Sequence, residues 1–121
     1  MAVSSGLVFA AIACSSLAHA DTLLPDDAVE LHQQRAVFSQ LEGMVQIGVS
    51  VKNVTDGPLA SIIVSCDALD NDENLLDNGL AEIINVRPGV TQRTFVDMPS
   101  TTDPKLRFDC RVTRADPPDD N

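Results

Sequence analysis

Two of the three cysteines, Cys66 and Cys110, give this 121-residue chain its clearest chemical signal. Each lies in a segment whose apolar residues alternate with polar ones, and each is on the apolar side. In an oxidising compartment, such a pair forms a disulfide. A redox-active pair would favour the Cys-x-x-Cys spacing that lowers a thiol's pKa, and this spacing is missing. The sequence therefore predicts a structural Cys66–Cys110 disulfide.

A second cluster could bind a metal ion. Asp70, Asp72 and Asn74 stand at alternate positions, as do the first oxygen ligands of a calcium loop. The rest of that motif fails, because Leu75 replaces the glycine of the sharp turn and Ala81 replaces the closing glutamate. We expect a solvated acidic turn here, with weak calcium binding as the alternative.

The sequence offers little for catalysis. His32 is the one histidine outside the N-terminal segment discussed below, and it lies in a polar stretch. Ser50 follows Gly48 as in a nucleophile elbow, but Lys52 replaces the second glycine and the serine lies inside a strand pattern. Neither zinc-ligand spacing nor a glycine-rich phosphate loop occurs. We expect no catalytic residues and no cofactor.

The N-terminus has the features of a bacterial export signal. Residues 6–13 (GLVFAAIA) are apolar but too few to span a bilayer, which takes roughly 20 residues. A small-x-small site then predicts cleavage between Ala20 and Asp21. The alternative is lipoprotein processing, with a lipid anchor on Cys14. Either route predicts a periplasmic or secreted protein that does not insert in the membrane after signal removal.

The net charge of −10 falls entirely on the part after residue 20. Such a field repels nucleic acid and anionic lipid surfaces, so nucleic acid is not an expected partner. The basic residues of the later strands alternate with carboxylates, which favours ion pairs across strands on a solvated face. These residues are Arg93, Lys105, Arg107 and Arg111, interleaved with Asp97 and Asp109.

The elements that carry these residues follow from period-two alternation, which predicts strands at 44–53, 60–69, 80–86, 90–98 and 105–114. Turn residues separate them, including the pair Asn78-Gly79. Residues 28–41 fit a short helix capped by Asp27, or alternatively an edge strand at 36–41. We therefore expect a leader at 21–43, one domain at 44–114 and a disordered acidic tail at 115–121. Regularly spaced short strands predict an all-β antiparallel sandwich or barrel, and we expect the sandwich.

Three motifs resemble the FxLYD family of small bacterial extracytoplasmic domains. They are the strand end at 49–56 (VSVKNVTD), the turn at 87–89 (RPG) and the following Phe95. The resemblance spans about residues 44–98 and lacks the family's aromatic residue at Leu69. It implies an immunoglobulin-like sandwich that acts as an accessory or interaction module and brings no catalytic residues.

These observations lead to an exported, non-catalytic protein-interaction module as the expected function. Its partner would bind at loops or at a sheet edge, where unpaired backbone groups can accept another strand. Residues 60–70 and 80–86 are the candidate edges. The alternative is a small acidic inhibitor or immunity protein that blocks the basic site of an exported enzyme.

Overall fold

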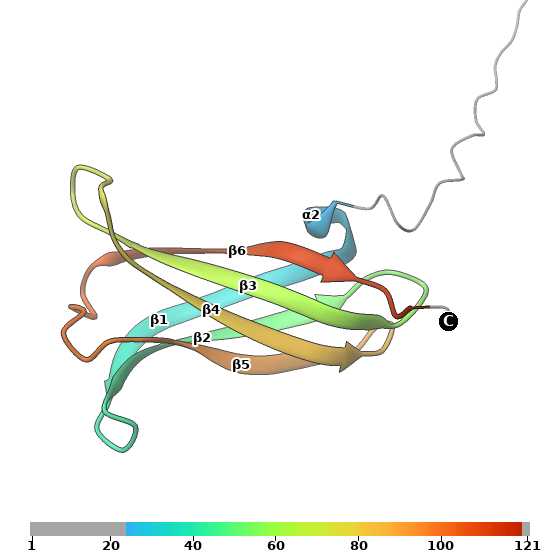
Figure 1. The fold of residues 1–121 in the computed structure, drawn as a ribbon, viewed down its shortest axis with the longest axis horizontal. Coiled ribbons are helices and arrows are strands. Elements are labelled where there is room, and N and C mark those ends of the chain that lie inside the picture. The colour runs from blue at the N-terminus through green and yellow to red at the C-terminus, as the bar shows by residue number, and fades with distance from the viewer. Residues whose placement is uncertain (1–23, 120–121) are drawn as a thin grey trace, which may run out of the picture.

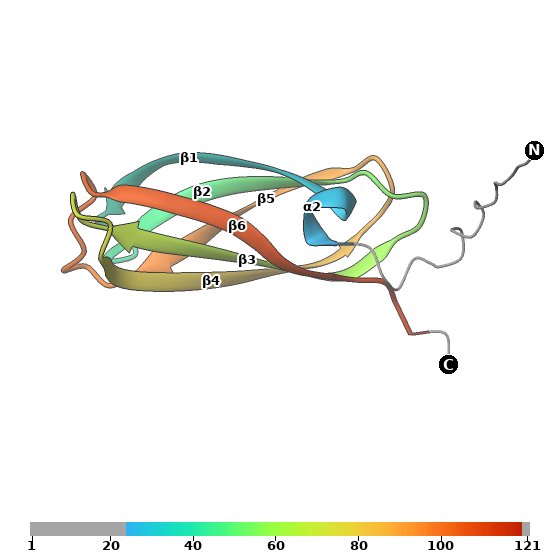
Figure 2. The same ribbon diagram turned by 90° about the horizontal axis from the view of Figure 1, so that it is seen from above.

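The structure, a computed structural model, describes residues 24–119. It contains helix α2 (Pro25–Ala28) and strands β1 (Val29–Ser39), β2 (Met44–Asn53), β3 (Leu59–Leu69), β4 (Leu75–Val86), β5 (Thr91–Met98) and β6 (Arg107–Asp116). Sheet A has the strand order β1-β2-β5 and sheet B the order β4-β3-β6, and all pairs are antiparallel. The strands run along the long axis (Figure 1), and the sheets form two layers (Figure 2). The predicted all-β antiparallel sandwich is confirmed.

The core lies between the two layers and is almost entirely aliphatic, as the alternation predicts. Every second residue of β2 and of β3 is buried, and the end of β5 adds two more side chains. These residues are Val45, Ile47, Val49, Val51, Ile62, Val64, Cys66, Ala68, Val96 and Met98. Fully burying one such aliphatic side chain stabilises the fold by about 1.5–3 kcal/mol.

The helix predicted over residues 28–41 is wrong, because most of this segment is strand β1. The alternative prediction of strand at 36–41 has the right type as far as Ser39. A bulge between Gln33 and Ala36 shifts the pairing of β1 with β2. Because the bulge breaks the period of two, the apolar residues take a spacing that imitates a helix. The sandwich therefore begins at Val29 rather than at Met44.

The turn predicted at Asn78-Gly79 is also wrong. Both residues lie inside β4 and pair with Asp67 and Cys66 of β3. Gly79 serves close packing instead, since a Cβ atom there would lie 2.7 Å from the carbonyl oxygen of Asp97 on β5. Two strands of different sheets can approach this closely only at a residue without a side chain. Near the C-terminus, β6 extends to Asp116, two residues beyond the predicted strand end.

A buried amide closes one end of the sandwich. The side chain of Asn53, at the end of β2, is fully buried and uses all its hydrogen-bonding capacity. Its Nδ2 donates to the carbonyl oxygens of Gly57 and Val86, both at 2.9 Å. Its Oδ1 accepts from the backbone N–H and the hydroxyl of Thr55. Asn53 thereby fixes the β2–β3 turn against the end of β4, because a buried polar group is stable only when its bonds are satisfied.

The predicted Cys66–Cys110 disulfide is present, with an S–S distance of 2.03 Å. The two residues face each other directly on β3 and β6, with their Cα atoms 4.0 Å apart. Such a short separation is typical of the pairs in an antiparallel ladder that do not exchange backbone hydrogen bonds. The bridge therefore joins neighbouring strands within sheet B rather than linking the two sheets.

Candidate interaction surface

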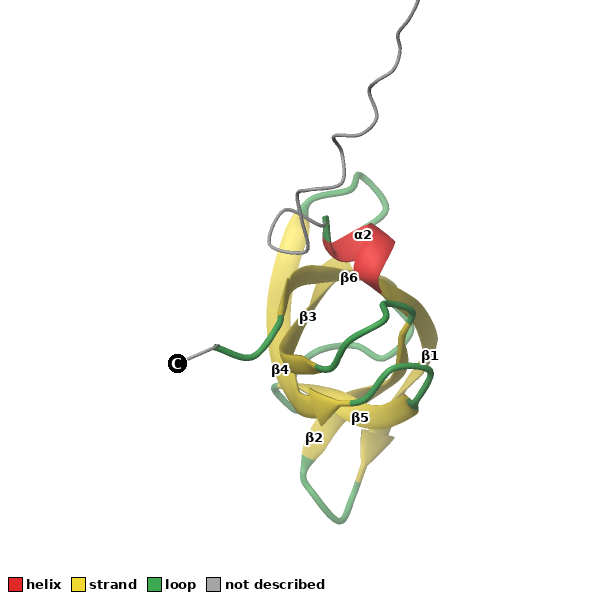
Figure 3. Cartoon of the chain, turned by 90° about the vertical axis from the view of Figure 1, so that its right-hand side faces the viewer, coloured by secondary structure: helices red, strands yellow, loops and turns green. Residues whose placement is uncertain are grey.

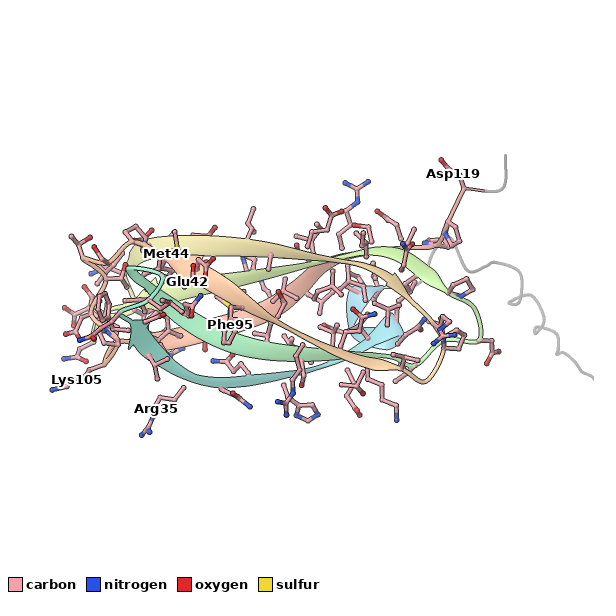
Figure 4. The ribbon with its side chains drawn as sticks, turned by 90° about the horizontal axis from the view of Figure 1, so that it is seen from below. Arg35, Glu42, Met44, Phe95, Lys105 and Asp119 are labelled. Atoms are coloured by element: carbon pink, nitrogen blue, oxygen red, sulfur yellow. A yellow bond between two sulfur atoms is a disulfide. The ribbon has the colours of Figure 1, made fainter. Side chains whose placement is uncertain are left out.

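The outer face of sheet A contains a hollow of about 180 Å³, which we call the Gly48 hollow. Residues 48–50 of β2, residues 93–95 of β5 and Gln34 of β1 line it. Gly48 lies directly opposite Phe95 in the β2–β5 ladder. Figure 4 shows Phe95 on the face that β2 and β5 form. An apolar cavity of about 150 Å³ is large enough to hold a benzene-sized group, so this hollow has room for one side chain.

Three local features create the Gly48 hollow. Gly48 has no side chain, so the backbone of β2 forms a bare floor at this point. A Cβ atom there would lie 3.0 Å from Oε1 of Gln34 and 3.7 Å from the ring of Phe95. The β1 bulge positions Gln34 beside this floor. A strand glycine beside an aromatic residue marks a place where another group can approach the backbone.

Exposed apolar side chains also lie on the neighbouring strand of sheet B. Phe95 is 56% exposed, and Leu80 and Ile84 of β4 are 63% and 57% exposed. Strand β4 meets β5 at Gly79, beside the Asp97 carbonyl, and Glu82 lies between Leu80 and Ile84 on the same face of β4. Seen end-on, the strands form a flattened ring in which β4 and β5 are neighbours (Figure 3). We call Leu80, Ile84 and Phe95 the apolar strip.

Arg93 supplies a cation at the edge of the hollow. No carboxylate among residues 24–119 lies within 4 Å of its guanidinium. Ser50 lies opposite Arg93 in the ladder, and Asp97 accepts a hydrogen bond from Gln46 instead. The predicted interleaving of Arg93 with Asp97 therefore produces no ion pair here. Arg93 is left free to attract an anion.

On sheet B one ion pair joins two strands as predicted, and Arg107 pairs within its own strand and with a loop. Arg111 reaches Asp67 at 2.8 Å across the β3–β6 ladder. Arg107 lies 2.9 Å from Glu73 and 2.8 Å from Asp109. The hydrogen bond from Arg111, followed by one from Asn78, lowers the pKa of Asp67 below its usual value of 3.8. These charges are already neutralised by their neighbours within the chain.

The acidic turn at Asp70 forms a structure of its own. Its carboxylate accepts hydrogen bonds from the backbone N–H groups of Asp72 and Asn74, at 2.8 and 2.9 Å, and from the Asn74 amide at 3.1 Å. The bonds from Asn74 are the main reason why the pKa of Asp70 lies below its usual value. The oxygens proposed as calcium ligands thus close the turn. Among residues 24–119, no three His, Cys, Asp or Glu side chains gather as a metal site would require.

The other chemically active residues do not form a hydrogen-bonded catalytic triad among residues 24–119. The side chain of His32 is 73% exposed, and its nearest carboxylate oxygen, on Glu30, lies 3.9 Å away. The Cys66 and Cys110 sulfurs are joined to each other. Ser50 faces solvent from β2 beside the hollow. Ser50 lies opposite His32 in the β1–β2 ladder. The hydroxyl of Ser61 donates to Glu82 at 2.6 Å, and that of Thr102 donates to Asp77 at 3.0 Å. Neither of these two hydrogen-bonded pairs includes a histidine.

The two candidate edge strands fare differently. The prediction of an edge at residues 60–70 is wrong, because β3 lies in the middle of sheet B and pairs on both sides. The other candidate, 80–86, belongs to β4, which ends its sheet but packs beside β5. Alternating segments show which residues share a face, but not which strand is central, since that order depends on long-range pairing.

Strand β6, at the other end of sheet B, is protected by a side chain. The Gln33 amide on β1 donates to the Phe108 carbonyl at 2.9 Å and accepts from the Cys110 N–H at 2.8 Å. It thereby takes the place that a peptide group of an added strand would occupy. Capping an edge in this way reduces unwanted pairing with another chain.

The signal cleavage site at Ala20 and Asp21 and the candidate lipid site at Cys14 lie outside the described residues. No helix within residues 24–119 has the length and apolar character needed to cross a membrane.

Comparison of the chain with protein-family models, with curated proteins and with solved structures finds no significant match.

Sequence reasoning missed the Gly48 hollow, although one signal for it was available. A glycine inside a strand pattern weakens the strand and often marks a close approach by another group. Gly48 fits that description. Its pairing with Phe95, however, depends on the β2–β5 register, which joins residues far apart in the chain.

Proposed function

We propose that this protein is an exported, non-catalytic protein-interaction module of a bacterial envelope or secreted protein. Its binding surface would be the Gly48 hollow together with the apolar strip. The observation that carries this proposal is the exposure of Phe95, Leu80 and Ile84, each more than half open to solvent. Large exposed apolar side chains beside a hollow fit a site that a partner covers.

Two features support the exported location. The Cys66–Cys110 disulfide fits an oxidising compartment, since such bonds are rare in the cytosol. The N-terminal sequence also has the apolar run and small-residue site of an export signal. A periplasmic or secreted protein accounts for both.

The chemistry of the surface supports a binding role rather than a catalytic one. The ionisable residue of the hollow, Arg93, has no carboxylate within 4 Å among residues 24–119. His32 is exposed, and no hydrogen bond joins it to Ser50, which lies opposite it in the β1–β2 ladder. Binding by shape and charge requires none of these catalytic arrangements.

The FxLYD resemblance remains part of the proposal. Two of its motifs, the strand end at Asn53 and the later Phe95, occupy defined structural positions, in the buried amide network and beside the hollow. The strand orders β1-β2-β5 and β4-β3-β6 support this part of the proposal, because they correspond to A-B-E and C′-C-F of an immunoglobulin-like sandwich. The disulfide differs from that of antibody domains, which links the two sheets.

Site-specific photocrosslinking in the cells that export the protein would test the function. A photoreactive amino acid placed at Phe95 or at Leu80 should give one discrete protein adduct. The same group at Thr113, which is exposed on sheet B, serves as the matched control and should give none. Equal labelling from all three positions, or no adduct from Phe95 and Leu80, would contradict the proposal.

A further inference from the structure

We infer that the partner presents an extended acidic peptide segment to the outer face of sheet A. A carboxylate of that segment would pair with Arg93, and a neighbouring apolar side chain would enter the Gly48 hollow against Phe95. This inference rests on the proposed function and names the chemistry of the partner at the same surface.

The charge of the site supports an acidic partner even though the chain as a whole is acidic. In the β2–β5 ladder, Ser50 lies directly opposite Arg93, and Gly48 and Lys52 are its diagonal neighbours on β2. Thr91 and Phe95 lie two positions from Arg93 on β5. None of these neighbours is acidic. Glu30 lies opposite Lys52 in the β1–β2 ladder, so Arg93 is the cation that matters for a ligand. At physiological salt the Debye length is about 8 Å, so distant carboxylates are screened and Arg93 dominates at short range.

The contrast with the arginines of β6 makes Arg93 informative, and its place in the hollow separates it from Arg35 and Arg87, which also have no carboxylate within 4 Å among residues 24–119. Arg107, Arg111 and Arg114 on β6 each have a carboxylate within 2.6–2.9 Å. Arg93 has none within 4 Å among residues 24–119. In a chain with 18 acidic and 8 basic residues, an arginine without a carboxylate partner beside an aromatic ring is the place where a ligand's carboxylate fits best.

The shape of the site favours a peptide over other anions. The hollow of about 180 Å³ accepts one side chain, and an extended peptide places an acidic and an apolar side chain within a few ångströms of each other. A nucleic acid or an anionic membrane would bring many negative charges close to a chain of net charge −10, which is repulsive.

Peptide titration followed by amide NMR of the isotope-labelled full exported chain would test this inference. The probe is Ac-Glu-Leu-Glu-Leu-NH₂. Its controls are Ac-Gln-Leu-Gln-Leu-NH₂, which lacks the charge, Ac-Glu-Ser-Glu-Ser-NH₂, which lacks the apolar groups, and Ac-Lys-Leu-Lys-Leu-NH₂, which reverses the charge. We expect the probe to shift the amide signals of Gly48, Ser50, Arg93 and Phe95, and to bind about tenfold more tightly than each control.

Matched variants separate the charge from the hollow. Arg93→Gln should weaken binding of the probe about tenfold and remove its advantage over the glutamine peptide. Gly48→Val fills the hollow but keeps the charge, and should remove the advantage over the serine peptide. Lys105→Gln removes the same charge from the loop before β6, outside the residues that line the hollow, and should change nothing. A dispersed spectrum confirms that each variant is folded.

Four outcomes would overturn the inference. They are no shift with any peptide at millimolar concentration, equal binding of the glutamic acid and glutamine peptides, equal losses in Arg93→Gln and Lys105→Gln, and tighter binding of the lysine peptide. Preferential binding of a single-stranded oligonucleotide or a phosphatidylglycerol vesicle at the same residues would also overturn it. If photocrosslinking at Phe95 still gives a discrete adduct, the surface stands and only the acidic chemistry of the partner is wrong.

Discussion

The outer faces of the two sheets differ in how their charges and glycines are used. On sheet B, the arginines of β6 pair with carboxylates of the same chain, and a disulfide joins β6 to β3. On sheet A, Arg93 has no such partner among residues 24–119, and Gly48 leaves bare backbone beside Phe95. One face satisfies its polar groups internally, and the other leaves them available.

This difference separates stability from function. A surface ion pair contributes little to stability. It does neutralise the arginine, so that the arginine is less able to bind an anion of another molecule. An unpaired arginine beside an open hollow contributes little to the fold and keeps its full capacity for an external anion. Substitutions on sheet B should therefore change the free energy of unfolding, whereas those around Gly48 should change binding.

Removing the disulfide should have the largest effect on stability. The Cys66→Ala/Cys110→Ala variant opens a loop of 44 residues, for which chain entropy gives a loss of about 4 kcal/mol. Urea denaturation followed by circular dichroism measures the change, and the wild type under reducing conditions is the control. A loss below about 1 kcal/mol would show that sheet B does not depend on its covalent link.

Two glycine substitutions should give opposite results. Gly79→Ala places a methyl group 2.7 Å from a backbone oxygen of β5, which cannot move without shifting the strand. We expect a loss of about 1–3 kcal/mol, as for overpacking a core. Gly48→Ala meets only the flexible end of Gln34, so its effect should stay within about 0.5 kcal/mol.

Thermal unfolding of the two glycine variants under identical conditions measures the difference. Equal losses would contradict the view that Gly79 is required for packing while Gly48 leaves open space.

Replacing single arginines should show a smaller difference. Arg111→Gln breaks the ion pair with Asp67 and should cost about 0.5–1 kcal/mol, less at high salt. Arg93→Gln breaks no ion pair and should leave the free energy of unfolding unchanged within about 0.5 kcal/mol. Denaturation at low and high salt measures both. A larger loss for Arg93→Gln than for Arg111→Gln would reverse the assignment of roles.

The pH dependence should show the smallest effect. Because its hydrogen bonds lower the pKa of Asp67 below 3.8 in the folded chain, its contribution is fully present above that value. It is lost as the pH falls through the lower, folded pKa. Below this pH range, the wild type should lose a little more free energy of unfolding than Asp67→Asn does. The difference between the two losses should be under about 1 kcal/mol.

Denaturation curves recorded at stepped pH values would measure this loss, with Asp97→Asn as the control on sheet A. Identical pH profiles for the wild type and Asp67→Asn would contradict the prediction.

Much of the fold could be predicted from the sequence because period-two alternation is a local property. The inward faces of β2 and β3 follow from it, as does the placement of both cysteines on inward positions. The first part of β1 could not be predicted, because its bulge removes the alternation that marks a strand. Gly79 was misread for a similar reason, since its role is set by β5, which lies nearly twenty residues away.

The candidate surface could not be predicted from the sequence, because it depends on pairing between distant strands. Arg93 and Phe95 were both visible in the sequence, but the ladder decides that Phe95 faces Gly48 and that Arg93 faces Ser50 rather than a carboxylate. The acidic turn shows the opposite case, since the carboxylate of Asp70 bonds to amides only two and four residues away.

By itself, the sequence determined that this chain is built from strands with an aliphatic interior and that its two later cysteines face that interior. Those properties depend on neighbouring residues, which the chain order lists directly. Only the tertiary structure decided which strands are central, which arginines find a carboxylate and where a glycine leaves open space. These depend on the register between distant strands, and register is fixed by the packing of the whole core.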